Sequence, residues 1–305
     1  MRFRIAVALI ALAALFYALS GTAEVPGKAR FVGTYIWRSN DPNVGGLSAL
    51  ELLPNGTDFM AVSDRGMLIR GQLLRRDGNI VGVVNVTPTP LTPPEGTPVR
   101  APHSDAEGLA RHPDGRLFVS LEGPAQVWAY KAPGTAATLL PHHPDFNKMG
   151  SNSSLEALAI DAHGRLFAIP EKPLTRRDGV AVYVYAGAGW QRAFTLSRNS
   201  RFLPVGADFG PDGKLYLLER RFDGIGFSSR VRRFDLSSDT PDGGEVLLRS
   251  HLAQFDNLEG LSVRRDGQDQ IRLTMVSDDN FKFFQRTELV EYVITEPLAK
   301  AASKQ

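Results

Sequence analysis

The sequence contains no cysteine, and this absence excludes several kinds of protein. Disulfide bonds cannot stabilise the fold, an N-terminal cysteine cannot carry a lipid anchor, and no thiolate can act as a nucleophile or a metal ligand. The stability of the folded chain must therefore come from a packed core.

Several catalytic and binding motifs are missing as well. The chain has no Gly-x-Ser-x-Gly elbow, no spacing of Ser, His and Asp that suggests a triad, and no glycine-rich phosphate loop between a strand and a helix. Basic and acidic residues are interspersed at a net charge of +2, without a block of lysine or arginine. We therefore expect neither a nucleotide cofactor nor nucleic acid as a partner.

The longest apolar run lies at the N-terminus. Two arginines precede the run Ile5–Leu19, and small residues follow it up to Ala23, which is the order found in a secretory signal peptide. The run is shorter than the roughly 20 residues that cross a bilayer. We therefore expect residues 1–23 to be removed, leaving a monomeric, periplasmic or secreted protein without a membrane segment. An uncleaved membrane anchor is the alternative.

A repeat of about fifty residues organises the rest of the chain. The segment Ala106–Glu122 aligns without a gap with Leu155–Glu171, 49 positions later, and related copies begin near residues 45, 204 and 258. Each copy has a short apolar run, a turn with Asp-Gly, Asn-Gly or His-Gly, and a second run that ends at an acidic residue, which is typical of a β-hairpin. Two more strand-like runs follow each hairpin, so that each repeat is predicted to hold four strands.

Four antiparallel strands in each repeat predict an all-β fold, a β-propeller of about five four-stranded blades. The last copy lacks one strand, whereas the strand-like run Phe31–Trp37 has no hairpin before it. Pairing of Phe31–Trp37 with Glu288–Ile294 would close the ring and remove both open sheet edges. The propeller domain is then expected to span residues 30–296, followed by a polar tail at 297–305. Six blades is the alternative, if the segment 81–104 contains a degenerate blade.

Glycine and proline mark the turns of this predicted fold. The 29 glycines and 20 prolines stand mostly in short clusters between apolar runs, as they do in chains with many tight turns. The proline-rich stretch Thr87–Pro102 is predicted to be an extended, exposed insertion between the first and second blades. A lid is the alternative interpretation of this stretch.

The repeat is expected to gather acidic residues at one mouth of the propeller. The inner strand of a blade starts at the face where the second strand ends, because the two strands form a hairpin. Three acids begin inner strands and five end second strands: Glu107, Glu156 and Glu259, and Asp64, Glu122, Glu171, Glu219 and Asp278. In the first and fourth copies the inner position is predicted to hold Gly45 and Val205. Glu219 stands one residue before the aligned position, which Arg220 occupies.

Converging carboxylates repel one another unless a cation or an Arg or Lys side chain lies between them. Oxygen donors with few histidines favour Ca²⁺ over Zn²⁺, and Ca²⁺ is therefore the expected cofactor. The predicted ligands are Glu107, Glu156, Glu259, Asp64, Glu122, Glu171 and Asp278, and further oxygen donors nearby are Asp105, Asn152, Asn257, Asp279 and Asn280. The alternative is that each repeated Glu accepts a backbone N–H from a neighbouring blade and locks the ring.

Residues that occur in one blade only are the better candidates for chemistry. Five cations near the mouth are predicted to hold a phosphate or carboxylate of the substrate: Arg65, Lys172, Arg220, Arg221 and Lys282. His103 and Asp279 are predicted to move protons, with His103 acting as a base on metal-bound water. A histidine without a catalytic role is the alternative for His103.

Several strings of residues in this order resemble one family of exported bacterial proteins, the phytase-like (esterase-like activity of phytase) family. They are Gly45-Gly46-Leu47-Ser48, Ala61–Gly66, Asp105–Ala110, Leu218–Arg220 and Asn257–Leu261. The resemblance covers residues 30–296 and implies a β-propeller, export, and hydrolysis of esters or phosphate monoesters. The metal-binding loops and phosphate clamps of propeller phytases find no match here, so the likeness extends only to the acidic strand ends, Arg65 and Arg220.

Two functions follow from these features. The first is a Ca²⁺-dependent hydrolase that acts on a small anionic or ester substrate at the acidic mouth. The second is a periplasmic propeller without catalytic activity that binds a ligand or a partner protein there, since one propeller scaffold supports many functions.

Overall fold

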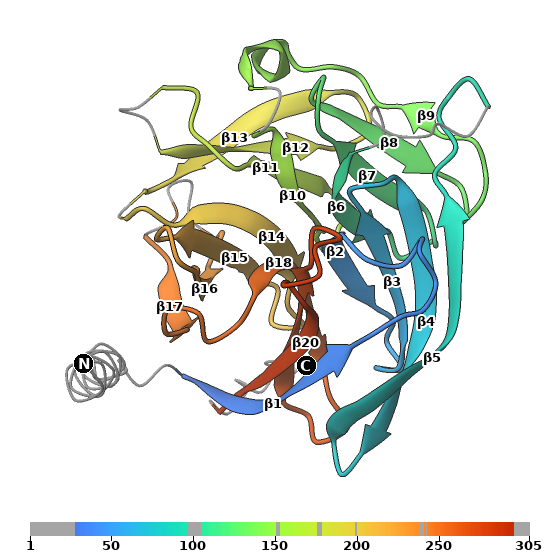
Figure 1. The fold of residues 1–305 in the computed structure, drawn as a ribbon. Helices are drawn as coiled ribbons and strands as arrows, with labels where there is room; N and C mark the ends of the chain where they lie inside the picture. The colour runs from blue at the N-terminus through green and yellow to red at the C-terminus, as the bar shows by residue number, and fades with distance from the viewer. Residues whose placement is uncertain are drawn as a thin grey trace, which may run out of the picture.

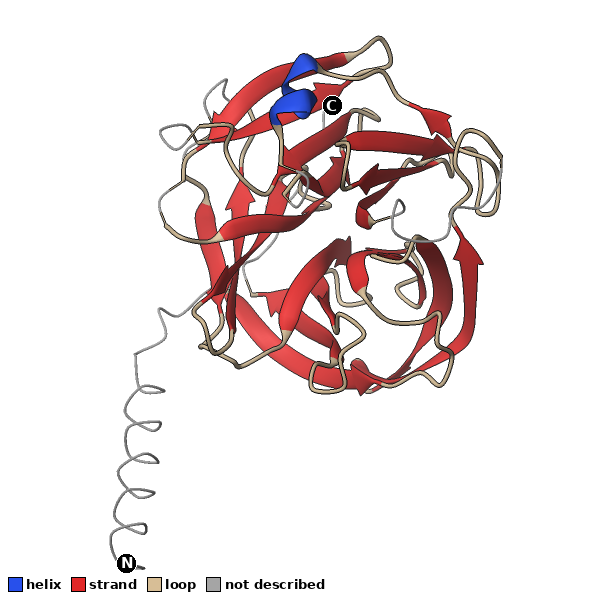
Figure 2. Ribbon diagram, turned by 45° about the horizontal axis from the view of Figure 1, so that its top comes forward, coloured by secondary structure: helices blue, strands red, loops and turns tan. Residues whose placement is uncertain are grey.

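Twenty strands form five four-stranded antiparallel sheets around a common centre, as Figure 2 shows. The structure is a computed structural model, and it describes residues 28–96, 105–150, 153–175, 179–198, 200–237, 241 and 243–295. The prediction of a five-bladed β-propeller is confirmed, and the residues in these ranges form no sixth sheet. Helices long and apolar enough to cross a membrane are absent from the same ranges. His103, Asn152 and the segments 1–23 and 297–305 lie outside the described residues.

Each blade runs from an inner to an outer strand. Blade 1 consists of β2 (Leu47–Leu52), β3 (Asp58–Ser63), β4 (Met67–Arg76) and β5 (Asn79–Pro90). Blade 2 consists of β6 (Ala106–Arg111), β7 (Leu117–Leu121), β8 (Gln126–Tyr130) and β9 (Thr138–Leu139), followed by the short 3₁₀ helix η1 (Pro144–Lys148). Blade 3 consists of β10 (Leu155–Ile160), β11 (Leu166–Pro170), β12 (Val180–Tyr185) and β13 (Trp190–Leu196). Blade 4 consists of β14 (Leu203–Phe209), β15 (Leu215–Phe222), β16 (Phe227–Phe234) and β17 (Glu245–Arg249).

Blade 5 combines the two ends of the chain. It consists of β18 (Asn257–Arg265), β19 (Ile271–Asp278), β20 (Thr287–Ile294) and β1 (Ala29–Trp37). The strands β1 and β20 lie side by side in Figure 1, and they pair antiparallel from Ala29 opposite Ile294 to Trp37 opposite Thr287. The predicted closure of the ring is therefore confirmed. The pairing covers the edge of β20, and β1 becomes the outer strand of blade 5.

The turns of the inner hairpins follow from the repeated glycine. Gly56, Gly115, Gly164 and Gly213 all have φ between 73° and 95°, a range that favours glycine because it has no Cβ. The hairpin of blade 5 differs, because its turn passes through Asp269 at φ 62° rather than through the Asp-Gly glycine. Its longer turn is held instead by Asp266, whose Oδ1 accepts from the N–H groups of Gln268 and Gln270.

The core is divided into five apolar clusters, and each lies between two neighbouring blades. Tyr183 is 0% exposed and Phe167 is 2% exposed, for example, and they belong to different clusters on the two faces of blade 3. Both faces of a blade are thus covered by its neighbours, which explains the long apolar runs of the inner strands. A single blade could not bury these faces alone.

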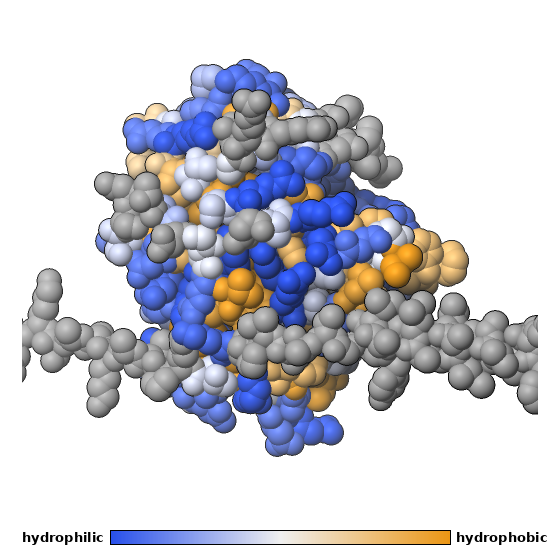
Figure 3. Space-filling model, turned by 90° about the vertical axis from the view of Figure 1, so that its left-hand side faces the viewer, coloured by the Kyte–Doolittle hydropathy of each residue, from blue (hydrophilic) through white to orange (hydrophobic). Residues whose placement is uncertain are grey.

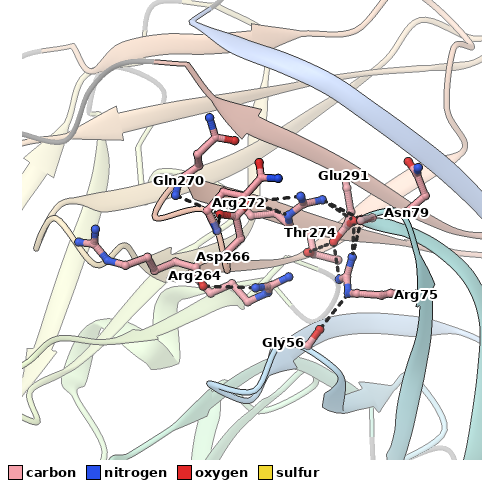
Figure 4. A network of polar contacts seen from close by, with 12 residues as sticks. Gly56, Arg75, Asn79, Arg264, Asp266, Gln270, Arg272, Thr274 and Glu291 are labelled. Carbon is pink, nitrogen blue, oxygen red and sulfur yellow. Dashed lines mark hydrogen bonds and ion pairs between the residues drawn. The ribbon is translucent and has the colours of Figure 1, made fainter.

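A polar network also joins blade 1 to blade 5 (Figure 4). Arg75 of β4 donates from Nη1 and Nη2 to the two carboxylate oxygens of Glu291 of β20, at 2.8 and 2.7 Å. Arg272 and Thr274 of β19 donate to the same carboxylate at 3.0 and 2.8 Å. Burial alone would raise the pKa of Glu291, but Arg75 and Arg272 outweigh it and hold this pKa below its ordinary value.

The proline-rich stretch is not an exposed insertion along its whole length. Thr87–Pro90 form the end of β5 and pair with β4, where Met67 lies opposite Pro90. Leu91 follows them into the core at 4% exposure. Proline is compatible with β5 because this strand is the outer edge of its blade. The remainder of the stretch beyond residue 96 lies outside the described residues.

Candidate functional site

A recurring irregularity shapes the start of the inner strands. In all five blades the pairing of the first two strands shifts register near the start of the inner strand. The residues at the shift are Ser48, Glu107, Glu156, Val205 and Glu259. A β-bulge re-aims a side chain, and here it directs the three glutamates and Ser48 into one cavity. The predicted first-blade residue, Gly45, is wrong: Ser48 holds that position.

We call this space the acidic cavity. It has a volume of about 230 Å³, and among the described residues eight carboxylates and one cation line it. The carboxylates are Asp64, Asp105, Glu107, Glu122, Glu156, Glu171, Glu259 and Asp278, and the remaining lining residues are Ser48, Arg220, Asn257 and Asn280. Seven of the eight repeated acids are thus brought together.

Glu219 is the exception to this gathering. Its carboxylate lies between the guanidinium groups of Arg230 and Arg232, at 2.5 and 2.7 Å, and is 2% exposed. Adjacent residues of a strand point to opposite faces, so Arg220 takes the position at the cavity and Glu219 faces away from it. The expectation that Glu219 joins the mouth is therefore wrong.

The side of the cavity formed by blades 3, 4 and 5 is neutralised by Arg220. Nη1 of Arg220 donates to Asn257 Oδ1 at 2.6 Å and forms a close ion pair with Glu259, and Nη2 lies 3.7 Å from Glu171 Oε1. Burial would lower the pKa of Arg220, but the charges of Glu259, Glu156 and Glu171 raise it above its ordinary value. Arg220 therefore stays charged and compensates these acids.

On the blade 2 side, no Arg or Lys of the described residues forms an ion pair with the cavity acids Asp105, Glu107 and Glu122. One carboxylate oxygen from each of Asp105, Glu107 and Glu122 can be chosen so that all three lie within 4.8 Å of one another. Burial and then the charges of Glu156 and Glu259 raise the pKa of Glu107 well above its ordinary value, and burial and Asp105 raise the pKa of Glu122 to about 7. Among the described residues, none of these three carboxylates is in an ion pair. We call them the carboxylate trio.

Two further acids border the trio. Burial, then the charges of Asp278 and Asp105, raise the pKa of Asp64 to about 7. The Oδ1 atom of Asp64 is buried without a hydrogen-bond partner in the described part of the chain. Burial and Glu259 raise the pKa of Asp278 to about 8. Clustered carboxylate oxygens with a buried, unsatisfied member are the donor set of a hard cation, and Ca²⁺ takes about six to eight such ligands. The residues present therefore fit the expected Ca²⁺.

The alternative of a ring lock applies to other acids. Glu51 of β2 accepts from the N–H of Arg111 in blade 2 at 3.2 Å, and Asp208 of β14 accepts from the N–H of Val263 in blade 5 at 2.6 Å. Both stand three residues after a register shift, so they join neighbouring inner strands. In the described ranges, the shifted glutamates Glu107, Glu156 and Glu259 accept no such backbone bond.

A second, larger space adjoins the acidic cavity. We call it the cationic pocket: it has a volume of about 840 Å³ and lies between blades 4 and 5. Five cations and two carboxylates line it: Arg201, Arg220, Arg221, Lys282 and Arg286, with Glu171 and Asp256. The two spaces share Glu171, Arg220, Asn257 and Asn280. The acidic cavity, with more acidic than basic residues, thus adjoins the cationic pocket, with more basic than acidic residues, and these four residues form the boundary.

Three of the five predicted substrate-binding cations, Arg220, Arg221 and Lys282, line this pocket. Lys172 instead pairs with its neighbour Glu171 at 2.8 Å. Arg65 stacks on Phe281, with Cζ 3.3 Å from the ring centroid, and lines neither space.

Asp279, predicted to move protons, is held by three donors. Its Oδ1 accepts from the N–H groups of Gly46 at 2.8 Å and Phe281 at 3.0 Å, and its Oδ2 accepts from Thr287 Oγ1 at 2.8 Å. The carboxylate therefore ties the β19–β20 loop to blade 1, and it lines neither space. The other predicted proton carrier, His103, lies outside the described residues.

The apolar wall of the pocket was missed by sequence reasoning. Phe222, Ile225 and Phe227 come from the β15–β16 hairpin, and Phe284 comes from the β19–β20 loop. Neither loop belongs to the repeat. The available signal was the run from Phe222 to Phe227, which has apolar residues around an Asp-Gly turn where polar residues are usual.

One family of known proteins matches most of this chain. The model of the family described as "Phytase-like: Esterase-like activity of phytase" matches residues 42–281. No protein with a curated description matches the sequence.

Similar solved structures cover most of the fold at low identity. Hydrazine synthase from Kuenenia stuttgartiensis is 17% identical over 86% of this chain and 67% of its own, with a TM-score of 0.45. The PQQ-bound aldose sugar dehydrogenase from Streptomyces coelicolor is 12% identical over 88% and 99%, with a TM-score of 0.45. A glucose dehydrogenase is 12% identical over 86% and 99%, with a TM-score of 0.49. These likenesses are too distant to carry a property of those proteins to this chain.

Proposed function

The chain belongs to the phytase-like family, and we propose that it is a Ca²⁺-dependent hydrolase of esters or phosphate monoesters. The active site is the junction of the acidic cavity and the cationic pocket. One observation carries the proposal: the carboxylate trio lacks an ion-pair partner among the described residues, and a pocket with five cations adjoins its cavity. This arrangement suits a cation and an anionic substrate side by side.

Asp105, Glu107 and Glu122 would hold the ion, together with the unsatisfied Oδ1 of Asp64. A bound Ca²⁺ would polarise the ester or phosphoryl oxygen and lower the pKa of a bound water. The cations of the neighbouring pocket orient the anionic group of the substrate, and Arg220 keeps Glu259 and Glu171 neutralised at the junction.

Proton transfer falls to Asp278 in this proposal. Burial and Glu259 raise the pKa of Asp278 to about 8, which favours the protonated carboxyl group at neutral pH in the metal-free protein. In hydrolysis the oxygen of water bonds to the acyl carbon or phosphorus and the water gives up one proton to solvent. The bond to the leaving oxygen breaks, and that oxygen takes a proton. Asp278 lines the cavity and would donate this proton. The carboxylate of Asp279 accepts three hydrogen bonds and lines neither space.

The test measures metal binding and turnover together on the mature chain, residues 24–305. Thermal unfolding with added Ca²⁺ and with chelator should show a higher midpoint with Ca²⁺, because a ligand that binds only the folded state stabilises it. Hydrolysis of 4-nitrophenyl phosphate and 4-nitrophenyl acetate should stop in chelator and return with Ca²⁺. Glu107→Gln should remove both the shift and the turnover, whereas Asp269→Asn, at an exposed turn, should change neither.

Full activity in excess chelator would sink the metal-dependent mechanism. A Ca²⁺ shift without turnover of either ester would instead identify a propeller that binds a ligand without catalysis.

Export is a further part of the proposal. The basic, apolar and small residues at positions 1–23 have the order of a signal peptide. N-terminal sequencing of the protein recovered from the periplasm or medium should begin at Glu24. Recovery of the intact N-terminus from the membrane fraction would favour an uncleaved anchor.

A further inference from the structure

The cationic pocket contains more apolar surface than recognition of a small anion requires. Ile225 is 80% exposed, Phe284 is 67% exposed and Phe222 is 56% exposed, and all three line the pocket. Figure 3 views the side of the molecule that is on the left in Figure 1 and shows apolar side chains among hydrophilic ones on that side. Large exposed apolar side chains that gather at a concave site mark a surface for a ligand.

The hairpin that presents this surface is held in place. The rings of Phe222 and Phe227 pack at its base with centroids 5.0 Å apart, and the N–H of Asp223 donates to the carbonyl of Gly226 at 3.1 Å. A Cβ atom on Gly226 would lie 2.9 Å from Cβ of Ala253, which shows how closely the hairpin approaches the segment before blade 5. Ile225 therefore projects from a braced turn.

Some cations of the pocket form ion pairs within the protein, and others do not. Arg221 pairs with Asp223 at 2.6 Å, Arg286 pairs with Glu288 at 3.1 Å, and Arg220 pairs with Glu259. Arg201 and Lys282 make no ion pair with any other described residue, and they stand on different segments that line the pocket. The pocket can therefore attract one anionic group without first breaking an internal ion pair.

We propose that the ligand of this pocket is amphiphilic: it carries one anionic group together with an aromatic or branched apolar group. The apolar group would cover Phe222, Ile225 and Phe284, and the anionic group would lie near Arg201 and Lys282. As an account of substrate, the inference rests on the proposed hydrolase function. A compact polyanion such as an inositol polyphosphate has no apolar part and would leave the aromatic wall exposed to water.

The test uses phosphonates, which cannot be hydrolysed, and protein kept in chelator, so that the result is independent of metal and turnover. Calorimetry compares phenylphosphonate with methylphosphonate, benzyl alcohol and inositol hexakisphosphate. Phenylphosphonate should bind at least about tenfold more tightly than methylphosphonate, because burial of a ring adds about 1.4 kcal/mol, which corresponds to that factor. It should also bind more tightly than benzyl alcohol, which has the ring but no anionic group. Inositol hexakisphosphate should bind more weakly than phenylphosphonate.

Two variants locate the binding site. The double variant Ile225→Ser, Phe284→Ser should remove the preference for the phenyl group and leave methylphosphonate binding unchanged, whereas Lys282→Gln should weaken both phosphonates. Val246→Ser, at an exposed apolar residue on β17, is the matched control and should change neither.

The outcomes separate this inference from the proposed hydrolase. Equal binding of the two phosphonates, tighter binding of inositol hexakisphosphate, or no binding at all would overturn the amphiphilic ligand, even if Ca²⁺-dependent turnover is found. Selective binding of phenylphosphonate that the double variant abolishes would support it, even if the protein turns over no ester.

Discussion

The acidic cavity and the cationic pocket adjoin each other but were built in different ways. The acidic cavity is lined by positions that recur from blade to blade, namely the register shift of the inner strand and the end of the second strand. The cationic pocket is lined mainly by the β15–β16 hairpin, the β19–β20 loop and the segments that lead into blades 4 and 5. The repeated positions therefore gather acidic residues in the acidic cavity. Loops that occur in one blade only form the adjoining cationic pocket, which has the opposite charge.

Arg220 is the boundary between the two regions, because it belongs to both. In the repeat, its position corresponds to the end of the second strand in the other blades, where they carry Asp64, Glu122, Glu171 and Asp278. A cation at this repeated position makes the two sides of the acidic cavity differ in charge compensation. One half is neutralised by Arg220, and the other half keeps the carboxylate trio.

The largest expected effect on stability comes from replacing Arg220, the boundary between the two regions. Arg220→Met should lower the free energy of unfolding of the metal-free protein by about 3–5 kcal/mol, because it leaves the buried carboxylate of Glu259 without its partner. Urea unfolding at neutral pH measures this loss. Arg221→Met is the matched control, since Arg221 pairs with Asp223 at the rim, and it should cost less than about 1 kcal/mol. Equal losses in the two variants would contradict the assignment of Arg220 as the boundary.

A smaller effect should come from Asp208, which is a partly buried acid outside both regions. Burial raises the pKa of Asp208 to about 7, from an ordinary value of 3.8. Between these two values the folded state binds more protons than the unfolded state, so this carboxyl group lowers stability as the pH rises through that interval. One such proton changes the free energy of unfolding by at most about 1.4 kcal/mol per pH unit.

Asp208→Asn should therefore flatten the decline of stability between about pH 4 and pH 7. The variant also loses one hydrogen bond accepted from a backbone N–H, which should lower the free energy of unfolding by a similar amount at every pH. The slope of that free energy against pH is therefore the informative quantity. Urea unfolding of both proteins in chelator, at several pH values across the interval, gives the two slopes. Parallel curves would show that Asp208 titrates normally and that burial of an acid in this ring does not by itself perturb it.

Much of the fold could be predicted because its signals are local. The Asp-Gly and His-Gly turns lie between apolar runs, so the inner hairpins and their spacing were visible in single segments. Pairing of Phe31–Trp37 with Glu288–Ile294 followed from the missing strand of the last blade, and β1 and β20 confirm it. Thr87–Pro90 were misassigned because proline is usual in loops and gives no signal for the outer edge of a blade.

The candidate site could be predicted only in part. Ser48 was missed and Gly45 chosen instead, because a register shift of one residue leaves no trace in an apolar pattern with small residues. Glu219 was placed at the mouth because it is acidic, although the alternation of the strand gives that place to Arg220. Asp279 was considered for chemistry because it stands beside Asp278, but its three donors come from Gly46, Phe281 and Thr287.

The sequence by itself favoured five blades and predicted the closure of the ring and the common mouth to which most repeated acids point. These properties depend on turn residues and on the two-residue period of a strand, and both act within a few neighbouring residues. Only the tertiary structure decided which acids Arg220 neutralises and where the cationic pocket lies. Glu171, Arg220 and Glu259 stand in three different blades, so their contacts exist only once the ring has closed.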